Sequence, residues 1–276
     1  MKRICVLMAT YNGEKYIEDQ ILSIRNQKEV ICDIYAWDDG STDKTISILK
    51  KNNVKILGSS LRFGKPCYVF FSLVLKIKKK YDYYSFSDQD DIWLVNKMFE
   101  GLITIKDKNL DLYSSNLISY DFKNKVSIVY KSTNQTKYDF LFQGLSAGNT
   151  YIFTYNLFNL LQSSIKKNSI TDLEFSHDWF LYALARQHGL KVFCDQRSFI
   201  IYPQHITNVS SSNTSLKFII KKIYYFLSLG HKKERARIHK LLFFNESKWF
   251  ILRNIFTLKR NKLYSIFYGI LLILGF

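Results

Sequence analysis

Residues 3–13 read RICVLMATYNG, residues 33–43 read DIYAWDDGSTD and residues 83–91 read YYSFSDQDD. Each stretch begins with apolar side chains and ends in polar or acidic ones. The apolar parts predict strands at residues 3–9, 33–37 and 83–87, the first of them buried on both faces. A further strand is expected at 54–58, and helices at 14–27, at 65–80 and from Ser41 or Thr42, as N-cap, to about residue 51. This alternation predicts an α/β fold with a parallel sheet.

The alternation is looser beyond residue 108. Apolar and β-branched runs predict strands at 110–116, 149–154 and 191–194, and a hairpin at 118–130. Helices are expected at about 156–162 and 178–188, the second ended by Gly189. No internal repeat and no linker rich in Pro or Ser separates these parts. We therefore predict one domain over residues 1–215, with halves at 1–108 and 109–215, followed by a helical segment at 216–276.

The composition excludes several classes of protein. The chain has 276 residues, of which 47% are apolar. It can therefore form a substantial core, and a wholly disordered protein is excluded. The apolar runs are shorter than the roughly 18 residues typical of a spanning helix, and the first residues do not resemble a signal peptide. The four cysteines contain no CxxC pair, which argues against a zinc site and a disulfide framework. Reduced thiols in a cytosolic protein are expected.

The positive charge is concentrated at the end of the chain. The net charge is +17, and residues 216–276 hold 13 Lys and Arg against two Glu, a net charge of +11. Basic residues interleaved with apolar ones are typical of surfaces that bind nucleic acid or an anionic membrane. The last 14 residues are uncharged but too short to cross a bilayer, so we expect these helices to lie in the membrane interface. The alternative is that they pack on the body or form a dimer interface.

Acidic or polar motifs follow three of the predicted parallel strands. Ligands of open α/β sheets bind at the carboxyl ends of the strands, so these motifs are expected to meet there. Clustered carboxylates repel one another unless a cation is present, and oxygen ligands favour Mg²⁺ or Mn²⁺. Taken alone, the motif DDGSTD at 38–43 is also typical of a simple turn, and the motif DQDD at 88–91 is also typical of a solvated turn. Two acidic motifs on one sheet favour a ligand-binding site over two unrelated turns. The chain contains neither GxxxxGK[ST] nor GxGxxG, which argues against a P-loop protein and a dinucleotide-binding protein.

Three segments in order, VLMATYNGEKYIEDQILSIRNQ at 6–27, IYAWDDGSTDKT at 34–45 and SFSDQDDIWLVNKM at 85–98, resemble the family 2 inverting glycosyltransferases. The resemblance covers residues 1 to about 208 and is greatest to the rhamnosyltransferase-like branch that builds capsule and O-antigen polysaccharides. It implies the GT-A fold, a Rossmann-like, mixed and mostly parallel sheet flanked by helices. Here a C-terminal helical, membrane-associating tail would follow that fold.

The resemblance also implies roles for the residues of the three motifs. The nucleotide pocket would be lined by residues after the first two strands: Thr10, Tyr11, Asn12, Glu14, Asp38 and Asp39. Asp39 would accept the imide N–H of a uracil or thymine. Asp88 and Asp90 occupy the DxD position and would hold Mn²⁺ or Mg²⁺. Asp88 and Asp91 would also lie at the donor sugar and diphosphate.

Further expectations concern the acceptor side and the donor lid. Asp178 in SHDWF matches the family's catalytic base, although an Asp at a helix N-terminus is also stabilised by the helix dipole. Glu174 is the next candidate for the base. His205 in YPQHITN resembles the YRQHxxN segment that closes over the donor, with Pro203 where Arg is common. Small residues at 144–149 would let an acceptor approach the backbone. The segment 62–65, at the start of a predicted helix, would contact phosphate oxygens of the donor or would simply be exposed.

Together these observations predict metal-dependent, inverting transfer of a sugar from a UDP- or dTDP-sugar donor. The acceptor is expected to be a saccharide, lipid-linked, and the protein to lie peripherally on the cytoplasmic face of the plasma membrane. The alternative is a basic membrane- or nucleic-acid-binding protein with a similar body but no transferase activity. The acidic site and the apolar character of the basic segment argue against nucleic acid as a partner. The sequence does not identify the sugar or the acceptor.

Overall fold

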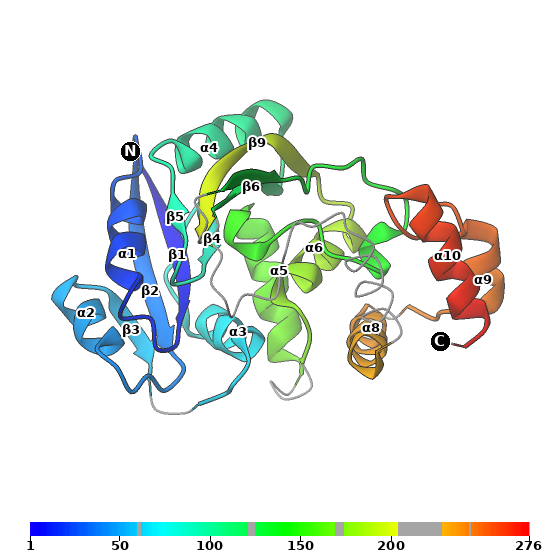
Figure 1. Cartoon of the computed structure of the whole chain (residues 1–276), viewed down its shortest axis with the longest axis horizontal. Coiled ribbons are helices and arrows are strands. Elements are labelled where there is room, and N and C mark those ends of the chain that lie inside the picture. Colours follow the sequence, from blue (N-terminus) through cyan, green and yellow to red (C-terminus); the bar gives the residue numbers. More distant parts are fainter. Residues whose placement is uncertain (60–61, 121–124, 169–173, 204–227, 243, 276) are drawn as a thin grey trace.

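The computed structural model describes residues 1–59, 62–120, 125–168, 174–203, 228–242 and 244–275. Within them a nine-stranded sheet carries helices on both faces (Figure 1). The strands are β1 Lys2–Thr10, β2 Val30–Asp38, β3 Lys55–Gly58, β4 Tyr83–Ser87, β5 Ile92–Trp93, β6 Leu112–Tyr120, β7 Val126–Val129, β8 Ile152–Thr154 and β9 Val192–Pro203. The α-helices are α1 Ile17–Arg25, α2 Thr45–Lys51, α3 Pro66–Lys76, α4 Lys97–Lys108, α5 Tyr155–Lys166, α6 His177–Gln187, α8 Leu229–Leu241, α9 Lys248–Asn254 and α10 Lys262–Ile273. Two 3₁₀ turns, η1 Asp139–Leu141 and η2 Gly148–Thr150, lie between β7 and β8.

The sheet is parallel in its first half and mixed in its second. The strand order is β3-β2-β1-β4-β8-β6-β9-β5, with β7 paired to β6. β1 is parallel to both β2 and β4, and β2 is parallel to β3. β8 is antiparallel to β4 and β6, whereas β6 and β9 are parallel. The first half therefore sets three carboxyl strand ends along one edge.

Strand β1 lies at the centre of the core because both of its faces are apolar. Ile4, Val6 and Met8 pack with α1, α2 and α4, whereas Cys5 and Leu7 pack with α3, α5 and α6 on the other face. All five side chains are fully buried. This burial of alternate residues on opposite faces is the reason the strand reads as an uninterrupted apolar run.

Most predicted elements of the body are present, although the short strand β5 was not predicted, the helix expected at 65–80 ends at Lys76 and the strand expected at 149–154 is limited to β8. The helix expected from Ser41 or Thr42 begins at Thr45, because the Ser41 hydroxyl and the Thr42 N–H bond instead to Asp38 and Asn12. Helix α4 was not predicted. Strand β9 is longer than predicted, continuing from Val192 to Pro203 beside β6. The predicted hairpin is confirmed as the antiparallel pair β6–β7, its turn at 121–124 being outside the described residues.

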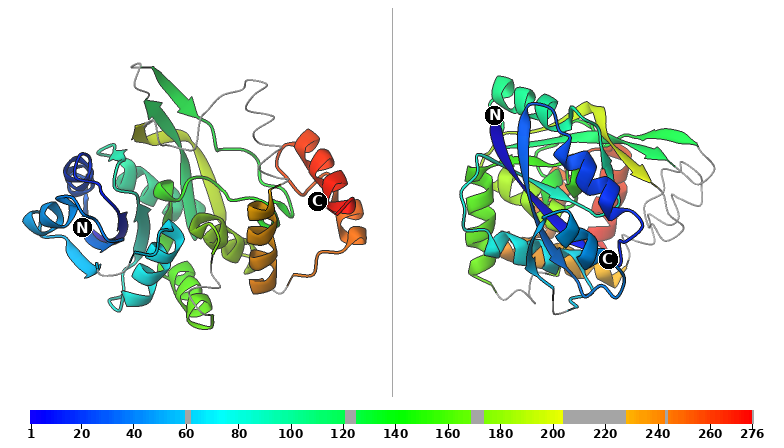
Figure 2. Two further views of the ribbon diagram at one scale, coloured as in Figure 1. Left: turned by 60° about the horizontal axis from the view of Figure 1, so that its bottom comes forward. Right: turned by 90° about the vertical axis from the view of Figure 1, so that its left-hand side faces the viewer.

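The described C-terminal helices pack on the body. Three residues of this part, Ile238 of α8, Leu258 between α9 and α10, and Tyr268 of α10, belong to the same buried cluster as residues of α3, α5 and α6. Helices α9 and α10 form the end of the molecule opposite α1 and α2 (Figures 1 and 2). The predicted boundary at residue 215 lies outside the described residues, as does the predicted helical segment as far as residue 227. Within the described ranges, no helix has both the length and the hydropathy needed to span a bilayer.

Candidate active site

The register of the parallel strands brings the three motifs together. Thr10 at the end of β1 pairs with Asp38 at the end of β2, and Met8 pairs with Ser87 at the end of β4. The polar segments that follow these strands consequently leave the same edge of the sheet. This is the edge at which open α/β sheets bind ligands.

The loop after β1 is joined to the loop after β2 by hydrogen bonds. Asp38 is fully buried and accepts from the Thr10 hydroxyl (2.9 Å) and from the Ser41 N–H (2.8 Å). The Asn12 side chain accepts from the Thr42 N–H (2.9 Å), and that of Glu14 accepts from the Lys44 N–H (2.9 Å). Asp38, Asn12 and Glu14 therefore hold the two loops in one conformation.

Asp39, the residue expected to read the base, contacts the segment before α3. Its carboxylate accepts from the Gly64 N–H (2.9 Å) and from the Phe63 N–H. The Arg62 guanidinium lies 4.5 Å from the centre of the Tyr11 ring, a cation–π contact. The segment 62–64 thus lies against the predicted base pocket, on the side of Tyr11 and Asp39.

Gln89, the middle residue of the DxD segment, was not predicted to have a role. Its side chain accepts from the Tyr11 N–H and donates to the Tyr11 carbonyl, both at 2.8 Å. A Cβ on Gly13 would lie 2.4 Å from the same side-chain oxygen, so Gly is needed there. These contacts fix the backbone of the β1 loop to the end of β4. The pair lies 78 residues apart in the chain, and no local pattern marks it.

Asp88 lies close enough to two other carboxylates of the site for their charges to act on it. The pKa of Asp88 is raised to about 7, first by burial and then by the negative charges of Asp90 and Asp178. Asp88 and Asp90 follow β4, whereas Asp178 is in the first turn of α6. The structure therefore brings the predicted metal ligands and the predicted base to one site.

Asp88 and Asp90 offer the kind of donor set that a hard divalent cation prefers. Their oxygens are carboxylate oxygens, and the mutual repulsion that raises the pKa of Asp88 would be relieved by a cation between them. Among the described residues, no three His, Cys, Asp or Glu side chains are placed so that they could hold one metal ion together. Water and a diphosphate would supply further ligands. On these terms the two residues fit Mn²⁺ or Mg²⁺.

Asp91 is buried beneath this cluster. Its Oδ2 accepts from the Asn149 amide at 2.7 Å, and its Oδ1 has no hydrogen-bond partner among the described residues. Burial, followed by the charges of Asp88 and Asp90, raises its pKa. Lys97, also fully buried, has a pKa lowered to about 7 by burial. Asp91 thus joins the DxD segment to η2.

Asp178 is held at the N-terminus of α6 by two donors on one oxygen. Its Oδ1 accepts from the Trp179 N–H (2.7 Å) and from the Ser176 hydroxyl. None of the described residues donates to Oδ2. His177 stacks on Phe70 at 4.0 Å between ring centres, so the start of α6 is fixed on both sides of Asp178. Oδ2 is the oxygen left to accept a proton.

Glu174, the second candidate for the base, is engaged elsewhere. It forms ion pairs with Lys65 and with Arg237 (3.2 Å for the latter). The hydrogen bond from Lys65 is the first cause that lowers its pKa. A carboxylate paired with two cations is a weaker base, and this geometry favours Asp178.

A hollow of about 440 Å³ lies beside Asp178, and we call it the α6 hollow. Ser146 lies on its body side, Ser176 and Asp178 at the start of α6, and Glu234 and Lys259 on the C-terminal helices and their connection. It is thus lined from parts of the chain that are far apart in sequence. Its mixture of hydroxyl and charged groups suits a polar ligand.

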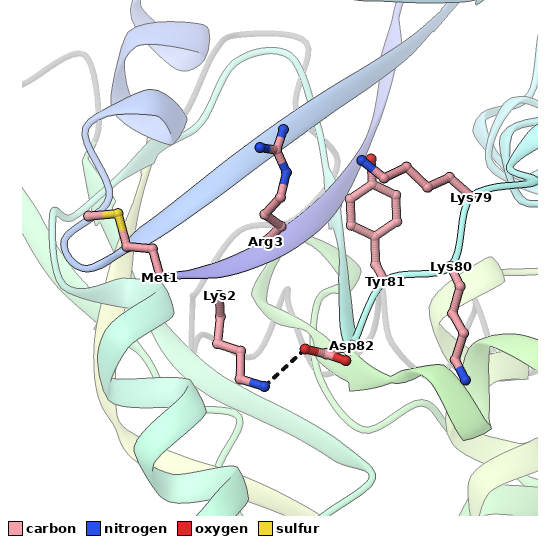
Figure 3. Close-up of a pocket in the computed structure, with 7 residues that line it drawn as sticks. All are labelled: Met1, Lys2, Arg3, Lys79, Lys80, Tyr81 and Asp82. Carbon is pink, nitrogen blue, oxygen red and sulfur yellow. Dashed lines mark hydrogen bonds and ion pairs between the residues drawn. The ribbon is translucent and has the colours of Figure 1, made fainter.

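A second hollow, of about 510 Å³, lies at the other ends of the strands (Figure 3). It is lined by Lys2, Arg3 and the turn before β4. Two of its cations are paired, Lys2 with Asp82 of the same hollow at 3.0 Å and Arg3 with Asp33, which is not part of the lining, at 2.6 Å. Because it lies at the amino ends of β1 and β4, away from the carboxyl edge, we do not assign it to the active site.

The comparisons with known proteins agree with this geometry. A family model described as glycosyl transferase family 2 matches residues 5–167. The chain belongs to glycosyltransferase family 2. It is 34% identical over 244 residues to the dTDP-rhamnosyl transferase RfbG of Shigella flexneri, covering 85% of this chain and 84% of that protein. The protein is accordingly a glycosyltransferase.

Solved structures show the same fold at low sequence identity. The structure of S. aureus TarS 1-349 in complex with UDP-GlcNAc aligns with a TM-score of 0.56 at 17% identity, over 96% of this chain and 76% of that one. A longer S. aureus TarS chain aligns over only 37% of its length. The mannosyltransferase PcManGT of Pyrobaculum calidifontis, in complex with GDP-Man and Mn²⁺, aligns with a TM-score of 0.54 at 11% identity, over 99% of this chain and 87% of that one. The GT-A-like, mixed α/β fold is thereby confirmed.

The glycosyltransferase thus assembles most of its predicted site residues at one sheet edge. Thr10, Tyr11, Asp38 and Asp39 lie at the ends of β1 and β2, next to the acidic segment after β4. His205 lies outside the described residues. Gln89, Asn149 and Ser176 complete the site through contacts that the sequence did not reveal.

Proposed function

We propose that this glycosyltransferase inverts the anomeric configuration of a sugar as it moves it from a nucleoside-diphosphate donor to a saccharide hydroxyl. The observation that carries the proposal is the electrostatic coupling of Asp88 to both Asp90 and Asp178. This coupling indicates that the proposed cation-binding pair, Asp88 and Asp90, lies close to the candidate base, Asp178. Inverting transfer requires this arrangement, with the base on the acceptor side and positive charge on the leaving-group side.

In the proposed reaction Asp178 removes the proton from the acceptor hydroxyl. The hydroxyl oxygen then forms a bond to the anomeric carbon as the bond from that carbon to the nucleoside diphosphate breaks. Oδ2 of Asp178 receives the proton, since Oδ1 is held by Ser176 and Trp179. The α6 hollow would hold the acceptor, because Asp178 lines it.

The donor would bind across the ends of β1, β2 and β4. Tyr11 and Asp39 would contact the base, and Asp91, whose Oδ1 lacks a partner among the described residues, would accept a hydrogen bond from a sugar hydroxyl. Mn²⁺ or Mg²⁺ held by Asp88 and Asp90 would supply the charge that stabilises the departing diphosphate. His205 is proposed to close over the donor.

Rhamnose from dTDP-rhamnose is the donor we propose first. The support is the 34% identity, over most of both chains, to a protein named as a dTDP-rhamnosyl transferase. We extend the proposal to synthesis of a cell-surface polysaccharide, capsule or O-antigen, on a lipid-linked acceptor. UDP-sugars are the second choice of donor.

We also propose that the protein binds the cytoplasmic face of an anionic membrane through α9 and α10. On α10, Leu263, Phe267, Ile270 and Leu274 are exposed and recur at helical spacing, while Tyr268 and Leu272 are buried. Trp249 on α9 is 81% exposed, and Lys248, Arg253 and Lys262 are exposed as well. Apolar stripes beside basic side chains suit the boundary between headgroups and acyl chains.

The proposed transfer is tested by incubating purified protein with a panel of UDP-, dTDP- and GDP-sugars and Mn²⁺ or Mg²⁺. Release of nucleoside diphosphate from dTDP-rhamnose, lost on addition of EDTA and in Asp90→Asn, is the expected result. Release that continues undiminished in EDTA would contradict metal dependence. Absence of both release and nucleotide binding across the whole panel would contradict the proposed function.

A further inference from the structure

Helix α8 contributes a carboxylate to the acceptor side of the site. Glu234 lines the α6 hollow together with Asp178. Its Oε1 accepts from the Ser176 N–H at 2.6 Å, and Ser176 is the residue that precedes α6. A residue of the C-terminal segment is thus bonded to the segment that presents the candidate base.

Ser176 transmits this contact to Asp178. Its backbone N–H donates to Glu234, whereas its hydroxyl donates to Oδ1 of Asp178. The Trp179 N–H donates to the same Oδ1. Since Ser176 supplies one of the two donors on this oxygen, the position of Ser176 helps to set the orientation of the Asp178 carboxylate. Loss of the bond to Glu234 would free Ser176 to move, and the Asp178 carboxylate with it.

The position of Glu234 is itself fixed, because the turn of α8 that follows it is anchored to the body. His239 contacts the Leu141 carbonyl through Nε2 at 2.8 Å, and Arg237 donates to the Glu174 carbonyl at 2.8 Å. Ile238 is fully buried in the main core cluster. The helix therefore presents Glu234 from a rigid support, which a positioning residue requires.

We propose that α8 builds one wall of the acceptor subsite and that Glu234 is a positioning residue, orienting the Asp178 carboxylate through Ser176. The inference rests on the proposed function, because it assumes that Asp178 is the base. It gives the C-terminal segment a part in the reaction, in addition to any contact with lipid. The ligand of this subsite is a sugar hydroxyl, which Asp178 deprotonates.

The test compares Glu234→Ala with Glu234→Gln in the full-length protein. The amide oxygen of Gln can still accept from the Ser176 N–H, whereas Ala cannot. We measure kcat for release of dTDP from dTDP-rhamnose with water as acceptor, the dissociation constant of dTDP, and thermal unfolding. Lys233→Ala, an exposed neighbour on the same helix, is the matched control.

We expect Glu234→Ala to lower kcat about tenfold or more, with the dTDP dissociation constant unchanged within about twofold, and Glu234→Gln to restore most of kcat. Wild-type kcat in Glu234→Ala would overturn the proposal. Equal losses of kcat in both variants would also overturn it, because they would indicate that the charge of Glu234 is what matters. A parallel loss of dTDP binding and stability would overturn it as well, because it would indicate a purely structural role. A wild-type protein that neither releases nor binds dTDP would instead refute the proposed function.

Discussion

The acidic residues of the candidate site and the loops that carry them are held by the polar side chains of Gln89 and Ser176. Asp88, Asp90 and Asp178 are marked by their position after an apolar strand or at a helix start. Gln89 and Ser176 act through contacts to Tyr11 and Asp178 that depend on the local path of the backbone. The two hydrogen bonds between Gln89 and Tyr11 form only because β1 and β4 pair in the observed register. The local sequence does not predict that register.

Gly148 is a residue whose small size the site requires. A Cβ there would lie 2.7 Å from Nε2 of His177 and 3.1 Å from Cβ of Asp178. His177 has little room to move, because it stacks on Phe70. We predict that Gly148→Ala displaces the start of α6, costs about 1–3 kcal/mol of unfolding free energy and lowers kcat at least tenfold.

Denaturant unfolding and donor-release kinetics measure both effects. Gly144→Ala is the control, because its Cβ would meet the backbone of Trp179 at an ordinary 3.5 Å. If Gly148→Ala were as stable and active as Gly144→Ala, the described packing around Asp178 would be wrong.

At the scale of elements, periodicity predicted the βα units of the first half and was less effective afterwards. Helix α4 was not predicted, although Met98, Leu102 and Ile105 recur at helical spacing. Strand β9 extends past residue 194 through DQRS, whose polar residues hide a strand in the pattern. Asp195 there accepts from its near neighbour Arg197 (2.7 Å) and from the hydroxyl of Tyr113 (3.1 Å), which is 82 residues away, so a long-range contact helps to stabilise it.

The C-terminal segment is fastened to η1 by a buried carboxylate. Asp139 is fully buried and lies 2.6 Å from Arg260 and 3.1 Å from Arg186, while the Tyr182 hydroxyl donates to it. Arg260 also donates to the Gly144 carbonyl at the wall of the α6 hollow. Removing the charge of Asp139 leaves two guanidinium groups without their buried counter-charge.

We therefore predict that Asp139→Asn lowers the free energy of unfolding by about 3–5 kcal/mol. Asp82→Asn removes the exposed pair with Lys2 (3.0 Å) and should cost at most about 1 kcal/mol. Urea denaturation of both variants provides the comparison. Equal stability losses would show that the contact between η1 and Arg260 is not the buried network described.

At the scale of the whole molecule, the concentration of basic and apolar residues after residue 215 predicts a distinct surface chemistry for the C-terminal segment. It did not reveal that α8 reaches the active site, since the bond between Glu234 and Ser176 joins residues 58 positions apart. Such a contact depends on how α8 packs against η1 and α6. The helices at the end of the chain thus combine buried faces with the exposed stripes of α9 and α10.

Membrane binding is predicted to depend on the exposed stripe of α10. Phe267 and Ile270 are 40% and 46% exposed, and replacing both with Glu removes apolar area and adds charge that anionic lipid repels. We expect the double variant to lose at least tenfold in binding to vesicles that contain phosphatidylglycerol, measured by co-sedimentation. Ile103→Glu, at a site 42% exposed on α4, is the control and should bind as wild type does. Unchanged binding by the double variant would contradict the membrane proposal.

The central claim is that Asp178 is the base of a family 2 glycosyltransferase, and Asp178→Asn tests it most directly. Asn keeps the size of the side chain and removes its basicity, so kcat for donor release should fall by about 100-fold or more. The dTDP dissociation constant should stay within about twofold of the wild-type value, because Asp178 lies on the acceptor side. Asp107→Asn, an exposed change on α4, should leave both quantities unaltered. Near-normal turnover by Asp178→Asn would contradict the account.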